Sequence, residues 1–221
     1  MGNFALSRVL LTHWHGDHTG GVPDLIRMYP YLSTAIYKHT PSKVQQPIVD
    51  GQIFQIEGAT VRAVHAPGHS TDHMCFILEE ENAMFTGDNV LGHGTAAVEK
   101  LSEWMETLRQ MQTHGCTKGY PAHGAVIEDL RTKIAGELAC KTRRERQALM
   151  ALQATKGNGS RGKGRLTVKE LVTAVYGASM DNGVRELALE PFMDEVLRKL
   201  AEDGMVGFEM RGGVKKWFVV T

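Results

Sequence analysis

The stretch THWHGDH, residues 12–18, places three histidines and an aspartate within six positions. His13 and His15 stand two apart at the end of an expected strand, so both side chains project to the same side. The glycine that follows lets the chain turn sharply, after which Asp17 and His18 can face a second cation beside the first. Packing alone gives no good reason for this cluster, and we interpret it as part of a metal centre.

Two metal ions need about six or seven ligands, so further ligands must come from distant loops. Three later segments place a histidine or a carboxylate directly after an expected strand: APGHS at 66–70, TGD at 86–88 and YPAHG at 120–124. They contribute, in chain order, His69, Asp88 and His123. Each alone is weak evidence, because strand ends commonly carry such residues. In this order behind the first cluster, they predict a centre with seven ligands.

Two more histidines are candidates for a place near this centre. His73 follows His69 by four residues and has a weaker claim, to a contact behind the ligands or with the substrate. His93, in the segment LGHG at 91–94, comes soon after Asp88 and could border a substrate pocket. The remaining histidines are most simply surface or strand residues.

The order of expected elements predicts a layered α/β domain. Apolar residues at helical spacing predict helices between Pro23 and Pro30, at 98–114 and at 127–154. Short apolar runs separated by turn residues predict the strands, which are 7–12, 34–38, 52–56, 60–66, 73–78 and 83–86.

The second half of the chain changes character near residue 155. The segment TKGNGSRGKGR at 155–165 has the glycine, serine and charge content of a flexible linker. After it, helices at 167–176 and 189–203 precede a hairpin at 205–220 that turns at Gly212-Gly213. We therefore expect a metal-binding α/β domain at 1–154, a linker at 155–165 and a winged-helix-like α+β module at 166–221.

The amino-acid composition indicates which classes of binding partner to expect. The 25 Lys and Arg residues equal the 25 Asp and Glu residues, so no overall field favours nucleic acid or a membrane, and a small or locally recognised substrate is expected. No apolar run approaches the roughly 20 residues that span a bilayer. Three cysteines without paired spacing fit a reduced, cytoplasmic protein.

The motif order HxHxDH, GH, GD and a later histidine before glycine resembles the metallo-β-lactamase superfamily. This resemblance implies an αββα sandwich and divides the ligands between two ions: His13, His15 and His69 for the first, Asp17, His18 and His123 for the second, and Asp88 as the bridge. Zinc is the expected ion, although the residue types do not exclude manganese or iron. Asp17 would also act in catalysis by orienting the attacking water.

A narrower resemblance covers most of the chain, including the segments 9–25, 49–54, 66–96, 119–130 and 166–177. They are similar to fungal lactamase-like thioesterases that partner non-reducing polyketide synthases. This similarity implies hydrolysis of an aromatic polyketide thioester, with the acyl-carrier-protein domain of the synthase as partner.

Two alternatives remain open at this stage. The chain also resembles lactamase-beta-2-like proteins, some of which are endoribonucleases, and the basic linker and winged-helix-like tail are the only support for RNA. Superfamily members usually carry strands and a helix before HxHxDH, whereas here the motif begins at residue 13, so much of the N-terminal half is expected to be missing. A non-catalytic fragment is the second alternative. The apolar strand at 9–11 would then leave an exposed edge that favours association.

Overall fold

The computed structural model describes residues 5–42, 44–156 and 164–220. The chain divides into two compact units, Met1–Gly136 and Glu137–Thr221. This division lies inside helix α4 (Leu130–Lys156), earlier than the expected boundary at 154. Most of the expected linker at 155–165 lies outside the described residues, so the division into hydrolase domain, linker and C-terminal module stays a prediction.

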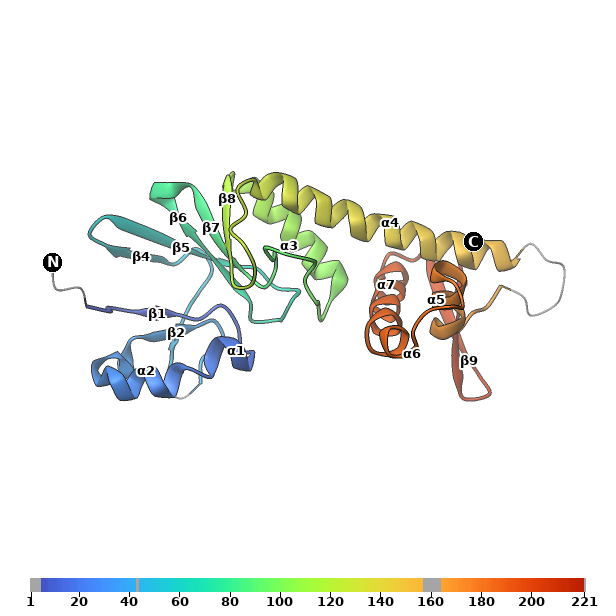
Figure 1. Ribbon diagram of the computed structural model, residues 1–221, viewed down its shortest axis with the longest axis horizontal. Coiled ribbons are helices and arrows are strands. Elements are labelled where there is room, and N and C mark those ends of the chain that lie inside the picture. The colour runs from blue at the N-terminus through green and yellow to red at the C-terminus, as the bar shows by residue number, and fades with distance from the viewer. Residues whose placement is uncertain (1–4, 43, 157–163, 221) are drawn as a thin grey trace. The chain divides into compact units, whose positions relative to one another are not determined.

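Two sheets form the first unit (Figure 1). The smaller sheet is parallel and has the order β1 (Val9–Leu10), β2 (Ile36–Lys38) and β3 (Gln46–Pro47). The larger sheet runs in chain order through β4 (Ile53–Ile56), β5 (Ala59–His65), β6 (Met74–Leu78), β7 (Ala83–Gly87) and β8 (Lys118–Pro121). Its strands are antiparallel except for the parallel pair β7 and β8.

Helices cover the two sheets from outside and give four layers in the order α, β, β, α. Helix α2 (Val22–Met28) packs Val22, Leu25 and Ile26 against Leu11 and Ile36 beside the smaller sheet. Helix α3 (Leu101–Thr113) lies beside the larger sheet in Figure 1. The short helices of this unit are α1 (Gly16–Thr19), η1 (Pro30–Thr34) and η2 (Glu79–Glu81).

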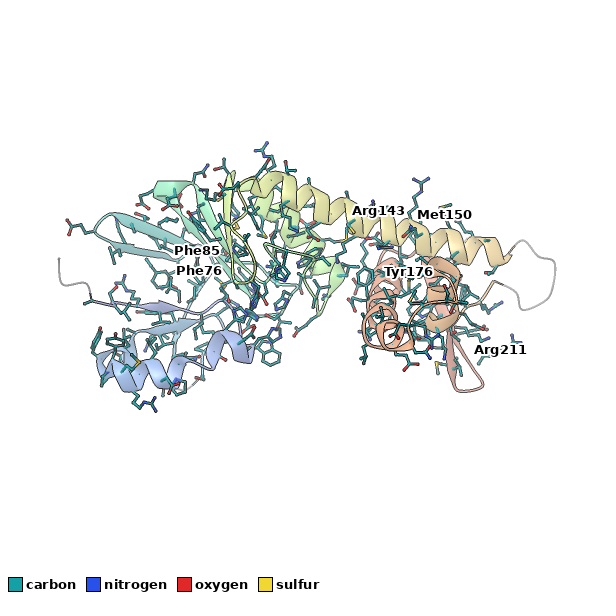
Figure 2. All side chains as sticks on the ribbon, in the orientation of Figure 1. Phe76, Phe85, Arg143, Met150, Tyr176 and Arg211 are labelled. Atoms are coloured by element: carbon teal, nitrogen blue, oxygen red, sulfur yellow. The ribbon has the colours of Figure 1, made fainter. Side chains whose placement is uncertain are left out.

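The core between the sheets is continuous over β4 to β6 and ends at β7. Phe54, Met74 and Phe76 pack there with Leu10 and Tyr37 of the smaller sheet. Phe85 on β7 pairs with Phe76 across the strands, yet it is 40% exposed (Figure 2). Within the described residues, β1 forms an edge of the smaller sheet. An apolar part of the inner face is therefore open to solvent.

The second unit contains the rest of α4 and a helical core closed by a hairpin. Thr167 and Glu170 form a reciprocal capping box at the start of the first helix, and Gly212 and Gly213 turn the hairpin with positive φ angles. The elements are α5 (Val168–Tyr176), α6 (Asn182–Val184), η3 (Arg185–Leu189), α7 (Glu190–Glu202), β9 (Val206–Arg211) and β10 (Val214–Val219). The expected order of helix, helix and hairpin is present, while the winged-helix assignment stays a prediction.

Packing and charge hold this unit together around Trp217, which is 1% exposed. The Lys199 ammonium bridges Glu145 of α4 at 2.8 Å and Asp203 at 2.7 Å. The Arg144 guanidinium lies over the Tyr176 ring, 5.1 Å from its centroid. Among the helices described in either unit, none combines the length and the apolar character needed to cross a membrane.

Candidate metal centre

Three imidazoles converge at the ends of β1 and β5. His13 Nε2 and His15 Nδ1 lie 2.8 Å apart, and His69 Nε2 lies 3.1 Å and 3.0 Å from these two nitrogens. His13 is 0% exposed and His69 is 7% exposed. We call His13, His15 and His69 the inner group.

Neighbouring atoms orient these rings. The Nδ1–H of His69 donates to the Ala97 carbonyl oxygen at 2.7 Å, which leaves Nε2 with a free lone pair. Burial, followed by the charges of His18 and His69, lowers the pKa of His13 to about 3. Burial also lowers the pKa of His69. Both rings are therefore neutral at neutral pH, the form in which imidazole binds metal.

A second set of donors lies beside the first and is more open to solvent. Asp17 Oδ2 lies 3.4 Å from His18 Nε2 and 3.2 Å from His123 Nε2. The side chains of Asp17 and His123 are 59% and 43% exposed, whereas that of His18 is 11% exposed. We call Asp17, His18 and His123 the outer group.

Asp88 belongs to both groups. Its Oδ2 lies 3.6 Å from His69 Nε2 of the inner group and 3.4 Å from His18 Nε2 of the outer group. Its Oδ1 lies 3.5 Å from His123 Nε2. The seven predicted ligands thus form two sets of donor atoms, each within 4.8 Å, that share one carboxylate.

These donors fit divalent metal ions. A tetrahedral zinc ion with Zn–N bonds of about 2.0–2.1 Å places its ligand nitrogens roughly 3.3 Å apart, close to the spacing of the inner group. Two buried atoms that point into the centre, His18 Nε2 and Asp88 Oδ1, have no hydrogen-bond partner among the described residues. A buried polar atom without a partner is costly, and a cation would satisfy both. The assignment of individual ligands stays a prediction.

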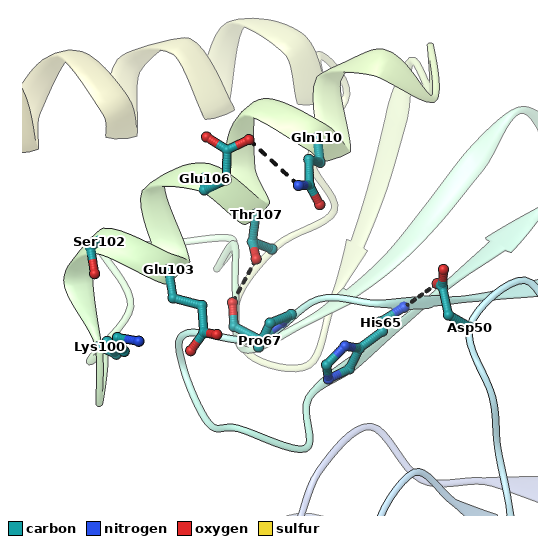
Figure 3. A pocket seen from close by; sticks show the side chains of 9 residues that line it. All are labelled: Asp50, His65, Pro67, Lys100, Ser102, Glu103, Glu106, Thr107 and Gln110. Carbon is teal, nitrogen blue, oxygen red and sulfur yellow. Dashed lines mark hydrogen bonds between the residues drawn. The ribbon is translucent and has the colours of Figure 1, made fainter.

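Helix α3 fixes the loop that carries His69 (Figure 3). Gly68 has φ +126°, and a Cβ there would lie 2.3 Å from the Cα of Trp104, so this close approach requires glycine. The Thr107 hydroxyl donates to the Pro67 carbonyl oxygen at 2.7 Å. The backbone amide of Lys100 donates to the Gly68 carbonyl oxygen at 3.1 Å. These contacts with the helix therefore fix the backbone position from which the His69 side chain extends.

The turn after β7 is fixed by His73, which is fully buried. The backbone amide of Asp88 donates to His73 Nε2 at 3.0 Å. Gly87 before it has φ +52°, and a Cβ there would lie 2.5 Å from the same Nε2. His73 is thus placed to position the backbone of the shared carboxylate.

Asp17 and His93 lie at the margin of the centre. Burial opposes ionisation of Asp17, but its own backbone amide and the charges of His18 and His123 lower the pKa of its carboxyl. His93 is exposed, and its ring lies against Gly124, the neighbour of His123. It is not among the donors grouped around either set of ligands.

A buried ion pair that the sequence patterns do not reveal lies beside the loop that carries HxHxDH. Asp72 accepts hydrogen bonds from Lys38, from the Ser70 hydroxyl at 2.9 Å and from the backbone amide of Trp14. Burial opposes its ionisation, but these donors lower the pKa of Asp72. The pair ties the HxHxDH loop to the His69 loop. No local pattern could reveal it, because 34 positions separate the two charges.

Residues 2–123 match the metallo-beta-lactamase superfamily, which covers more than half of the chain and all seven predicted ligands. The chain belongs to the metallo-beta-lactamase superfamily. Among solved structures of this fold, a beta-lactamase domain protein from Burkholderia ambifaria superposes with a TM-score of 0.76 at 19% identity. That comparison covers 96% of this chain and 74% of the other.

Curated relatives are more similar in sequence to this superfamily member. Atrochrysone carboxyl ACP thioesterase dmxR1 from Cryptosporiopsis sp. (strain 8999) is 70% identical over 99% of this chain and 70% of its own length. Atrochrysone carboxyl ACP thioesterase nsrC from Aspergillus novofumigatus (strain IBT 16806) is 74% identical over 97% of this chain and 67% of its own length. The family and fold implied by the motifs are therefore confirmed.

Proposed function

We propose that this protein is a metal-dependent hydrolase that cleaves the thioester joining an aromatic polyketide to the acyl-carrier-protein domain of a non-reducing polyketide synthase. The observation that carries the proposal is the 70% identity, over 99% of this chain, to a relative named as an ACP thioesterase. The two donor sets around Asp88 supply a site for such a reaction.

We propose two zinc ions, one for each donor group. Nitrogen and oxygen donors suit zinc, and manganese or iron would also accept this donor set. When bound, such ions polarise a carbonyl oxygen and lower the pKa of water.

The chain's own residues position the reactants. The exposed Asp17 carboxylate is placed to accept a hydrogen bond from the attacking water and to take its proton. The water oxygen adds to the thioester carbon, the C–S bond breaks, and the departing sulfur takes up a proton. The products are a carboxylic acid and the thiol of the carrier arm. His93, exposed beside Gly124, is proposed to contact the substrate.

The partner and the location are part of the same proposal. Release from a synthase requires contact with its carrier domain. The three cysteines are free, which supports the expected cytoplasmic location. The equal numbers of acidic and basic residues give RNA no general attraction, so we favour thioester hydrolysis over RNA cleavage.

Product release from a reconstituted synthase tests the function. We expect the free polyketide acid to appear faster when this protein is added, and His13→Ala to abolish the gain. Equal release with and without the protein contradicts the proposal. Metal analysis of the purified chain addresses the fragment alternative: about two equivalents of zinc and a cooperative unfolding transition argue against it.

A further inference from the structure

A cavity of about 540 Å³ opens beside the metal centre and has the size of a small-molecule site. Trp14, Thr19, Lys38, Pro41 and Thr71 are among the residues that line it.

The cavity adjoins the inner group through Trp14. This residue stands between the ligands His13 and His15, and its ring meets that of His15 edge to face with 4.5 Å between centroids. The Trp14 side chain is 54% exposed, although large aromatic residues are usually buried. A group resting on this indole would therefore lie next to the donors where a thioester carbonyl must sit.

The lining combines a flat apolar wall with hydrogen-bonding groups. Trp14 and Pro41 supply the apolar surface, and Thr19 and Thr71 are polar residues of the same lining. The buried Lys38 ammonium donates to the Thr40 carbonyl oxygen at 2.8 Å and to Asp72, and an ammonium has three N–H donors. Such a site suits a flat aromatic ring system that carries hydroxyl or carbonyl oxygens.

A second cavity, of about 560 Å³, differs in chemistry (Figure 3). Its walls carry Asp50, Lys100, Glu103 and Glu106, and its only ring with aromatic character is the imidazole of His65. Figure 3 shows its lining side chains on α3 and around His65 and Pro67. Charged carboxylates of this kind do not favour binding of a flat apolar group. The two cavities are therefore similar in size but differ in the ligands that their lining residues suit.

We propose that the cavity lined by Trp14 is the acyl subsite, which receives the hydroxylated aromatic acyl group of the substrate, and that Trp14 determines specificity for it. This inference rests on the proposed thioester hydrolysis. It adds which part of the substrate is recognised and where.

Two thioesters of N-acetylcysteamine test the proposal, because they share a leaving group and differ only in the acyl part. One carries 3-hydroxy-2-naphthoyl and the other acetyl. We expect Trp14→Ala to lower the ratio of kcat/KM for naphthoyl over acetyl by about 10- to 100-fold, mainly through KM for naphthoyl. Trp14→Phe should restore much of the ratio. An unchanged ratio overturns the inference. An unchanged ratio is also the result expected if the cavity receives the carrier arm, because the two thioesters share their leaving group.

Tyr31→Ala is the matched control, because Tyr31 is an equally exposed aromatic side chain outside the cavity. It should leave both rates unchanged. If the wild-type protein hydrolyses neither thioester, the proposed function fails while the subsite is still tested by binding.

That binding measurement uses a dihydroxynaphthalene, which carries the flat hydroxylated ring without a carboxylate or a thioester. Trp104 and Trp217 are 0% and 1% exposed, so Trp14 is the tryptophan that a bound ring can quench directly. We expect saturable quenching that Trp14→Phe abolishes, and calorimetric binding that Trp14→Ala weakens at least tenfold. Equal calorimetric affinity in the wild type and Trp14→Ala overturns the inference.

Discussion

The two donor groups share Asp88 but differ in how the fold holds them. In the inner group, His13 and His69 are buried and the His69 ring is oriented by a backbone carbonyl. In the outer group, the side chains of Asp17 and His123 are 59% and 43% exposed. Donor atoms that packing holds in place are already positioned for a metal ion, whereas water can replace exposed donor side chains around the ion. We therefore expect tighter metal binding at the inner group.

Removing the shared carboxylate should have the largest effect. Asp88→Ala removes the predicted ligand that both groups share, and two bound cations would then lack a common negative charge. We expect loss of both metal equivalents and a fall in kcat/KM of at least about a thousandfold, measured by metal analysis and thioester turnover. Asp24→Ala, at an exposed aspartate paired with Arg27, is the control and should change neither. Unchanged turnover in Asp88→Ala would show that this residue is not the bridge.

Substitution of one predicted ligand in each group should show how the two groups differ in metal affinity. His69→Ala removes a buried imidazole and should lower kcat/KM by about a thousandfold, with loss of the inner ion. His123→Ala removes an exposed ligand and should lower it by about 10- to 100-fold while one tightly held ion remains. A competitive chelator titration of both variants measures this directly. If the two variants lose metal in the same way, the distinction between inner and outer groups is wrong.

The buried histidines should also make the metal-free protein sensitive to acid. Burial and the charges of neighbouring histidines lower the pKa of His13 to about 3 and hold that of His73 well below 6.5. Between pH 6.5 and these lower values, the unfolded chain binds protons that the folded chain does not. The stability present above pH 6.5 is therefore lost as the pH falls, by up to about 1.4 kcal/mol per pH unit for each histidine.

Urea unfolding of chelator-treated protein at pH 7.5, 6 and 5 measures this loss. A Trp217→Phe background leaves Trp14 and Trp104, both in the first unit, as the fluorescent reporters. His13→Gln should make the dependence on pH less steep. A free energy of unfolding that stays constant from pH 7.5 to 5 would contradict the prediction.

The smallest effect is expected at His93, which lies outside both groups. His93→Ala should leave the metal content unchanged and raise KM by less than about tenfold, since an exposed side chain contributes little to binding. Steady-state kinetics with the naphthoyl thioester check this. A loss of metal in this variant would mean that His93 is a ligand.

The sequence predicted most elements because their patterns are local. The helix of Leu101–Thr113 lies within the expected 98–114, and the hairpin turns at Gly212-Gly213 as expected. The seven candidate ligands come together because all of them lie in the segments that follow β1, β5, β7 and β8, with Asp17 and His18 on helix α1 after β1.

What the sequence could not supply depends on distant packing. The pair of Lys38 and Asp72 joins a strand end to a loop, and neither residue stands in a recognisable motif for such a pair. The exposure of Trp14 could not be read from its neighbours either, because a tryptophan between two ligands suggests burial as readily as a cavity wall. Both features required the positions of loops relative to each other.

The end of β7 shows how little room for variation such a centre leaves. Gly87 has a backbone angle that L side chains rarely adopt, and a single added carbon would meet the His73 nitrogen that holds the Asp88 amide. The His73 ring is itself buried, so it cannot move aside without displacing its neighbours. Both the backbone angle and the lack of space therefore select glycine at position 87. A side chain at Gly87 would therefore disturb, through His73, the backbone that carries the shared carboxylate.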